Sequence, residues 1–167
     1  LYFDLGNNFP EPSQQGDLKI PLIHSAIEKF SPEAVLVGPN EWLNGLHWLD
    51  TKIPYLLSNQ STKLNFLNLK IIHNENRKLI VFGYLSPSLV YQNKNESSVI
   101  LPVNQELLSD WEKHIQTNKA KYLILLFRGN AEELNLFDKS GMFDLIVAGS
   151  NNDDELNQNL EMQVGTK

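Results

Sequence analysis

Short apolar runs alternate along the chain with segments whose apolar residues recur every three or four positions. The runs favour buried strands, and the helical spacing favours amphipathic helices between them. Two β-rich runs, residues 67–72 and 78–85, are separated by turn residues and predict a hairpin. Alternation of this kind is typical of a layered α/β fold. Strands are expected at residues 1–5, 34–38, 54–59, 67–72, 78–85, 121–127 and 143–149, and helices at 18–30, 41–49, 105–117 and from 131 onward.

Two of the expected helices begin at recognisable capping residues. Asn104 is a favourable N-cap, and Asn130 stands three residues before Glu133 in a capping-box-like pattern. The first helix shows one apolar face, as is typical of a helix that packs against a core. That face consists of Leu18, Leu22, Ile23, Ala26, Ile27 and Phe30.

Composition narrows the function classes. The chain has 167 residues, of which 41% are hydrophobic, so it can form one domain with a core of its own. A net charge of −6 disfavours a broad surface for nucleic acids or anionic membranes. No apolar stretch reaches the roughly 18 residues that span a bilayer. The absence of cysteine excludes disulfides, thiolate metal sites and cysteine nucleophiles.

The chain divides into a domain over residues 1–150 and a polar tail over 151–167, for which we expect fraying or a loose helix. Because sites in α/β sheets form at the carboxyl ends of strands, those ends carry the functional hypotheses. Each of them alone is compatible with an ordinary turn, where Gly and Asn are favoured. The four ends are Gly6-Asn7, Gly38-Pro39-Asn40-Glu41, Arg128-Gly129-Asn130 and Gly149-Ser150-Asn151-Asn152.

Taken in order, these four ends resemble the motifs of the calcineurin-like metallophosphoesterase domain of the 5′-nucleotidase family. The similarity is strongest in AVLVGPNEWLNGLHWLDTKIPYLLSN, residues 34–59, and extends over about residues 1–152. The resemblance implies a layered β-sandwich flanked by helices, with four layers in the order α/β/β/α. It also implies that the family's first strand and its Asp-x-His motif lie upstream of Leu1. The positions that fit the strongest segment are Gly38, Glu41, Gly45, Leu46, Pro54, Leu57, Ser58 and Asn59.

The chemistry that the resemblance implies does not carry over. In that family two metal ions activate a water molecule and bind the phosphate. The family's bridging Asp is here Asn7, its metal-binding Asn is Pro39 and its catalytic His is Asn40. The His at the end of the sixth strand is Arg128, a fixed cation that would repel a metal. The two His of the last motif are Ser150 and Asn152.

These replacements remove charges or donor nitrogens, so we expect no catalytic residue, no metal and no other cofactor at the motif positions. The remaining histidines are scattered, no two with the i, i+4 spacing of a helical zinc site, and structural roles are favoured for them. They are His24, His47, His73 and His114.

Three hypotheses remain open. The first is a non-catalytic domain whose relic cleft could bind a small polar or anionic ligand, or whose surface binds a second domain or protein partner. The second is a metal-dependent phosphoesterase or nucleotidase that uses carboxylates outside the recognised motifs, for which Asp4, Glu41, Asp50 and Asp144 are candidates. The third is a structural module of an exported protein, because the resemblance implies the periplasm or cell envelope of a bacterium. The relic cleft of the first hypothesis would contain Asn7, Asn40, Glu41, Arg128, Ser150 and Asn152.

Overall fold

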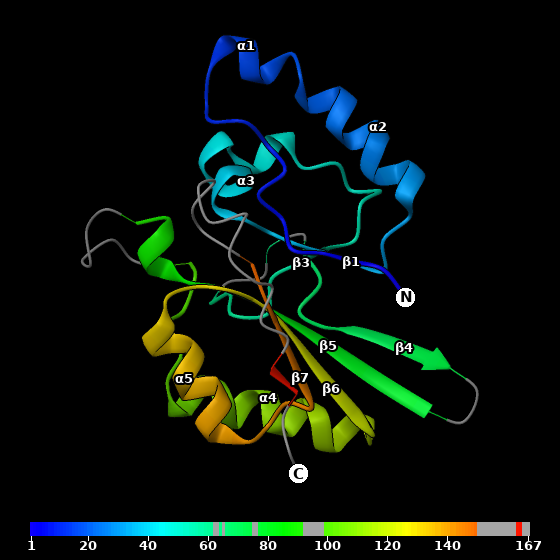
Figure 1. Ribbon diagram of the computed structural model, residues 1–167, viewed down its shortest axis with the longest axis vertical. Coiled ribbons are helices and arrows are strands. Elements are labelled where there is room, and N and C mark those ends of the chain that lie inside the picture. Colours follow the sequence, from blue (N-terminus) through cyan, green and yellow to red (C-terminus); the bar gives the residue numbers. More distant parts are fainter. Residues whose placement is uncertain (62–63, 65, 75–76, 92–98, 150–162, 165–167) are drawn as a thin grey trace.

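The computed structural model describes residues 1–61, 64, 66–74, 77–91, 99–149 and 163–164. Two sheets pack face to face, and each has helices on its outer face, so that the layers follow in the order helix, sheet, sheet, helix (Figure 1). This is the four-layer α/β/β/α arrangement that the resemblance implied, and that expectation is confirmed.

The smaller sheet is parallel and has short strands. It contains β1 (Phe3–Asp4), β2 (Ala34–Leu36) and β3 (Tyr55–Leu56), with β2 in the middle. The larger sheet has the order β4-β5-β6-β7-β8, with a parallel centre and an antiparallel strand on each edge. Its strands are β4 (Lys70–Asn74), β5 (Arg77–Leu85), β6 (Tyr122–Arg128), β7 (Leu145–Ala148) and β8 (Gln163–Val164). The predicted hairpin is the antiparallel pair β4 and β5.

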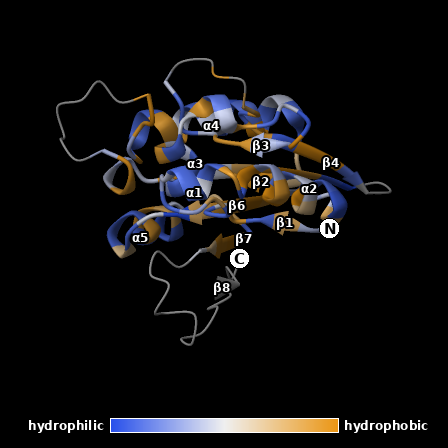
Figure 2. Cartoon of the chain, turned by 90° about the horizontal axis from the view of Figure 1, so that it is seen from above, coloured by the Kyte–Doolittle hydropathy of each residue, from blue (hydrophilic) through white to orange (hydrophobic). Residues whose placement is uncertain are grey.

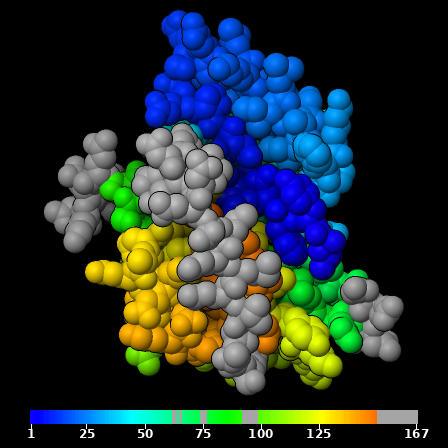
Figure 3. Space-filling view, viewed as in Figure 1, coloured from blue at the N-terminus to red at the C-terminus, as the bar shows by residue number. Residues whose placement is uncertain are grey.

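The helices divide between the two outer faces (Figure 1). The outer side of the smaller sheet carries α1 (Gln14–Asp17), α2 (Ile20–Phe30), α3 (Pro39–Asn44) and the 3-10 turn η1 (Leu46–Trp48). The outer side of the larger sheet carries α4 (Gln105–Asn118) and α5 (Ala131–Ser140), and a second 3-10 turn, η2 (Pro87–Leu89), follows β5. In the space-filling view the first helices, in blue, form one end of the visible face and α5, in yellow and orange, lies near the other (Figure 3).

Alternation along the strands separates three apolar clusters. In and just after β2, Val35 and Val37 face the helices, while Ala34 and Leu36 face the other sheet. Both faces of β2 are therefore apolar, which explains its hydrophobic colour, orange in Figure 2. The cluster outside the larger sheet is rich in aromatic residues: Phe82, Tyr84, Trp111, Phe127, Phe137 and Phe143.

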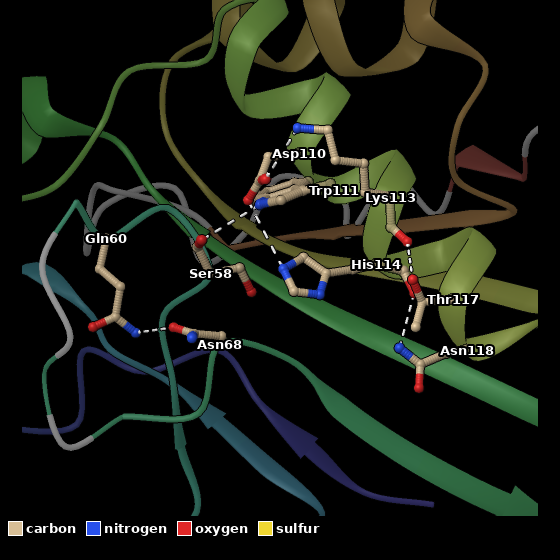
Figure 4. Close-up of polar contacts among 9 residues, drawn as sticks. All are labelled: Ser58, Gln60, Asn68, Asp110, Trp111, Lys113, His114, Thr117 and Asn118. Carbon is tan, nitrogen blue, oxygen red and sulfur yellow. Dashed lines mark hydrogen bonds and ion pairs between the residues drawn. The ribbon is translucent and has the colours of Figure 1, made fainter.

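Polar side chains at the end of β3 tie the two sheets together. The Ser58 N–H donates to the Gly83 carbonyl (2.7 Å), and the Gly83 N–H donates to Ser58 Oγ (2.8 Å). Figure 4 shows the Trp111 indole pointing from α4 to the Ser58 carbonyl, to which its Nε1–H donates at 3.3 Å. Asn59, which is fully buried, donates from Nδ2 to the Leu85 carbonyl at 2.8 Å.

Two expectations need correction. The helix expected over 41–49 ends at Asn44, because Gly45 has φ +98° and the chain restarts as the turn η1. The helix expected over 18–30 begins as α2 at Ile20, and the predicted apolar face is only partly buried: Ile27 is buried, whereas Leu18, Leu22 and Phe30 are more than 70% exposed. The helix is rotated so that Ile20 and Ile27, not the middle of the predicted face, meet the domain.

The tail expected at 151–167 lies outside the described residues, except for Gln163 and Val164 in β8. Within the part of the chain that the structure describes, no helix is long and apolar enough to cross a membrane.

Candidate functional site

The candidate site is the corner where the carboxyl ends of β1, β2 and β6 meet. We call it the sheet corner and define it by residues 4–9, 38–44 and 128. It brings together the first three of the four strand ends that the sequence singled out. Ser150 and Asn152, from the fourth, lie outside the described residues.

The loop after β1 makes a tight left-handed turn at this corner. Gly6 and Asn7 have φ values of +70° and +64°, a conformation that Gly adopts freely and Asn better than most residues. Asp4 supports the turn, because its Oδ1 accepts hydrogen bonds from the Gly6 N–H and from Asn8 Nδ2, both at 2.8 Å. The turn places the backbone N–H groups of the next residues toward α3.

Glu41 collects those N–H groups. It is the third residue of α3 and is fully buried, and its carboxylate accepts from Asn7 N (2.8 Å), Asn8 N (2.5 Å) and Phe9 N (3.2 Å). A fourth donor is Gly38 N at 3.1 Å, at the start of α3. Burial raises the pKa of Glu41, while the N–H donors of the loop act in the opposite direction. Glu41 is therefore an anchor for the backbone and presents no surface to a ligand.

Asparagines of the corner are engaged in the same way. Asn7 Oδ1 accepts from the Asn40 N–H (3.2 Å), and Asn40 Nδ2 donates to the Phe9 carbonyl (2.8 Å). One turn further along α3, Asn44 Nδ2 donates to the Pro10 carbonyl at 2.8 Å. Asn7, Asn40 and Asn44 thus connect α3 to the loop after β1, and both of these segments lie on the side of the smaller sheet.

Arg128 connects the corner to the larger sheet. It is the last residue of β6 and only 7% exposed. Its Nε donates to the Leu5 carbonyl at 3.0 Å, and its Nη2 donates to the Gly6 carbonyl at 3.2 Å. Gly149 lies against the guanidinium: a Cβ built on it would be 3.1 Å from Arg128 Cζ. The guanidinium thus lies between the turn after β1 and the end of β7.

A second glutamate, Glu133, forms hydrogen bonds at the ends of β5 and β6. The sequence pattern there predicts only the start of a helix. Glu133 Oε1 accepts from the hydroxyls of Tyr84 and Ser86, both at 2.8 Å, and its Oε2 accepts from Asn130 N at 3.1 Å. The capping-box pattern predicted the last of these contacts. The two hydroxyl contacts join α5 to the end of β5, and no local signal in the sequence indicates them.

The described residues contain no group of three or more His, Cys, Asp or Glu side chains that could hold a metal ion. Of the carboxylates that an alternative metal site would use, Asp144 lies at the opposite end of the larger sheet, where its Oδ2 accepts from Leu123 N at 2.9 Å. Asp50 Oδ1 accepts from Lys52 N in the loop before β3. Neither belongs to the loops that form the sheet corner with Asp4 and Glu41.

The four histidines lie on separate elements. His24 is half-buried on α2, where burial lowers its pKa, and His47, His73 and His114 are exposed on η1, β4 and α4. A cavity of about 240 Å³ beside β3 lies away from the sheet corner and shares no lining residue with it. Its walls are Leu46, Leu49, Asp50, Thr51, Ile53, Tyr55, Leu64 and Phe66.

Of the predicted site residues, the structure brings Asn7, Asn40 and Glu41 into direct contact and adds Arg128 through the Gly6 carbonyl. Sequence reasoning missed Asp4 as the support of the turn. A signal was available for it, since an Asp two residues before a Gly often hydrogen-bonds to the turn backbone. The long-range contacts of Glu41, which join positions 32 to 34 residues apart, have no such signal.

No protein-family model and no curated protein matches the sequence. Solved structures do match the fold. The NAD nucleotidase NadN of Haemophilus influenzae is 15% identical, with a TM-score of 0.67 over 92% of this chain and 30% of that one. The 5′-nucleotidase precursor of Thermus thermophilus is 16% identical, with a TM-score of 0.66 over 89% of this chain and 32% of that one.

The calcineurin-like phosphoesterase YfkN of Bacillus subtilis is also 16% identical, with a TM-score of 0.65 over 96% of this chain and 63% of that one. At these identities the likeness concerns the fold, which is that of the calcineurin-like metallophosphoesterase domain. The chain spans about a third of the length of the two nucleotidases that it matches.

Proposed function

We propose that this chain is a non-catalytic domain of the metallophosphoesterase fold, with a structural or binding role in place of hydrolysis. The observation that carries the proposal is the use of the polar side chains at the sheet corner. Asn7, Asn40, Glu41 and Arg128 each form hydrogen bonds with backbone groups of neighbouring loops. The resemblance assigns the positions of Asn7, Asn40 and Arg128 to the metal and catalytic site of a hydrolase of this fold.

The residues present do not fit a two-metal centre. A divalent cation requires several carboxylate, amide or imidazole donors directed at one point. At the sheet corner the Glu41 carboxylate is buried among N–H donors, and the Arg128 guanidinium places a fixed positive charge beside the turn after β1. These contacts favour a corner that is closed by the protein itself, and they support no step of metal-dependent hydrolysis.

The alternative is a metal-dependent phosphoesterase that uses other carboxylates, with Asp4 as its best candidate at the corner. The decisive experiment measures hydrolysis of bis-p-nitrophenyl phosphate and AMP by the purified full-length protein in MnCl₂, together with its metal content. We expect no turnover above the buffer rate and no stoichiometric divalent metal. Manganese-dependent turnover that Asp4→Asn abolishes would overturn the proposal.

The binding part of the proposal concerns a small polar or anionic ligand, a second domain or a protein partner. It is supported by the fold, which this chain shares with nucleotidases. A ligand that binds only the native state raises the melting temperature by mass action. We therefore propose a thermal-shift screen with phosphate, nucleotides and MnCl₂. A response to none of them favours the structural role, and a saturable response to phosphate or nucleotide identifies a ligand class.

The resemblance of the motifs also supports export to the periplasm or cell envelope. Fractionation of cells that produce the full-length protein tests this, and recovery in the cytoplasmic fraction alone would contradict it.

A further inference from the structure

Arg128 differs from the other polar residues of the sheet corner in joining the two sheets. Its backbone belongs to β6 of the larger sheet, and its side chain binds the turn after β1 of the smaller sheet. The two acceptors, the carbonyls of Leu5 and Gly6, are consecutive in the chain. A guanidinium presents several N–H donors in one plane, so a single side chain can bind both carbonyls at once.

The turn that Arg128 binds is fixed on its other side by close backbone packing. Gly6 has φ +70°, and a Cβ placed on it would lie 2.8 Å from the Gly38 nitrogen. Gly149 also packs against the guanidinium, where a Cβ would lie 3.1 Å from Nη2. The positive charge therefore lies in a confined position between three strand ends, with only 7% of the residue exposed.

We propose that the Arg128 guanidinium is a built-in cation at this corner: it links the two sheets through the Leu5 and Gly6 carbonyls and makes the domain independent of divalent metals. A cation that binds neighbouring carbonyl oxygens of a turn can fix that turn whether it is an ion or a side chain, and a side chain also ties the turn to its own strand. A covalently attached cation is always present, and its charge repels a second cation. The proposal deepens the non-catalytic role proposed above and rests on it.

The test is thermal unfolding of the full-length protein and of Arg128→Met, each in MnCl₂ and in EDTA. Methionine has a similar length but donates no hydrogen bond, so two carbonyls lose their partner. Two charge-assisted hydrogen bonds correspond to a fall in melting temperature of roughly 10 °C for a domain of this size. The melting temperature of the unmodified protein is expected to be the same in both buffers.

The matched control is Arg77→Met on β5, because Arg77 is exposed and makes a cation–π contact, with its Cζ 5.8 Å from the Tyr122 ring centroid. We expect this control to shift the melting temperature by no more than about 2 °C. Arg128→Lys retains the charge but not the fork, so it should fall between the unmodified protein and Arg128→Met.

If Arg128→Met does not fold, Arg128→Lys carries the test through hydrogen exchange of the amides of residues 6–9. Faster exchange at those amides than in Arg77→Met supports the link, and unchanged exchange overturns it. An Arg128→Met variant as stable as the unmodified protein also overturns it, as does a saturable rise in the melting temperature of the unmodified protein with MnCl₂. These results are distinguishable from failure of the proposed function, which manganese-dependent turnover would reveal.

Discussion

Glu41 and Glu133 are each the third residue of a helix that begins directly after a parallel strand. Each carboxylate accepts a hydrogen bond at 3.1 Å from the N–H of the residue before its helix, Gly38 in one case and Asn130 in the other. Beyond that shared contact the two turns differ. Glu41 is fully buried and binds three further N–H groups of the loop after β1, whereas Glu133 is half-buried and binds two hydroxyls at the end of β5.

The difference follows from what each helix packs against. The helix that contains Glu133 lies over long strands with an aromatic core, so its position does not depend on the glutamate alone. The helix that contains Glu41 has six residues and lies beside strands of two or three residues. Short strands supply few ladder hydrogen bonds, and the loop after β1 therefore depends on side chains to satisfy its N–H groups.

The largest effect that we expect comes from Glu41→Gln. The amide nitrogen of Gln must face N–H donors at one of the two carboxylate positions, so about half of the hydrogen bonds are lost and donors oppose each other. We expect a loss of about 3 kcal/mol in the free energy of unfolding, measured by urea denaturation. Glu133→Gln is the matched change and should cost about 1 kcal/mol, because hydroxyl groups can rotate to donate or accept. Equal losses in both variants would contradict the comparison.

Gly38→Ala tests the close packing of the same turn. A Cβ on Gly38 would lie 2.6 Å from Glu41 Oε2 and 2.9 Å from the Asn7 Cα. Because a backbone cannot move aside as a flexible side chain does, we expect a loss of about 2 kcal/mol by urea denaturation. The control is Gly141→Ala at the end of α5, where a Cβ meets nothing within 4 Å and only the φ of +61° is unfavourable. A Gly38→Ala variant less affected than Gly141→Ala would show that the turn can relax.

Much of the fold could be predicted from the sequence, because its signals are local. The apolar run of β6, the N-cap Asn104 and the pair Asn130 and Glu133 each lie within one element, and the structure confirms them. The order of the layers came from the resemblance and is also confirmed.

The contacts of the sheet corner could not be predicted in the same way. Asn7, Asn40 and Arg128 were singled out by position, but their partners are backbone atoms, which leave no pattern in a sequence. The apolar spacing also did not predict which face of α2 is buried. Its apolar residues span more than half of the helix surface, so the spacing alone does not tell which part meets the sheet, and Phe30 is exposed while Ile20 is buried.

Tyr84 gives a smaller and pH-dependent effect at the Glu133 turn. Burial, followed by the charge of Glu133, raises the pKa of Tyr84 above its ordinary value. The folded state therefore retains the phenol proton while the unfolded chain loses it above a pH of about 10, so stability falls as the pH rises through that value. Tyr84→Phe removes the hydrogen bonds to Glu133 and from Val103 N, and should cost about 1.5 kcal/mol at pH 7.

The alkaline loss of stability should also be shallower in Tyr84→Phe than in the unmodified protein. Burial raises the pKa of Tyr55 as well, so some alkaline loss remains. Tyr55→Phe is the control, because the Tyr55 hydroxyl is buried without a hydrogen-bond partner in the described part of the chain. It should cost less than about 0.5 kcal/mol at pH 7. Urea denaturation between pH 7 and about 10.5, just above the ordinary pKa of tyrosine, compares the two variants. A larger cost for Tyr55→Phe at pH 7 would contradict the assignment.

The smallest effect is expected where the two turns are made alike. Asn130→Gly gives α5 the same N-cap residue that α3 has in Gly38. Glu133 can still accept a hydrogen bond from the N–H of residue 130. Glycine is itself an acceptable N-cap, so the cost should be only about 0.3 kcal/mol, whereas Asn130→Ala should cost about 1 kcal/mol. Urea denaturation of the two variants side by side measures the difference. If Asn130→Gly proves as costly as Asn130→Ala, then the Asn130 side chain stabilises the Glu133 turn by more than its hydrogen bond from Glu133 N implies. The two turns would then differ in their N-cap residues as well as in the hydrogen-bond partners of their glutamates.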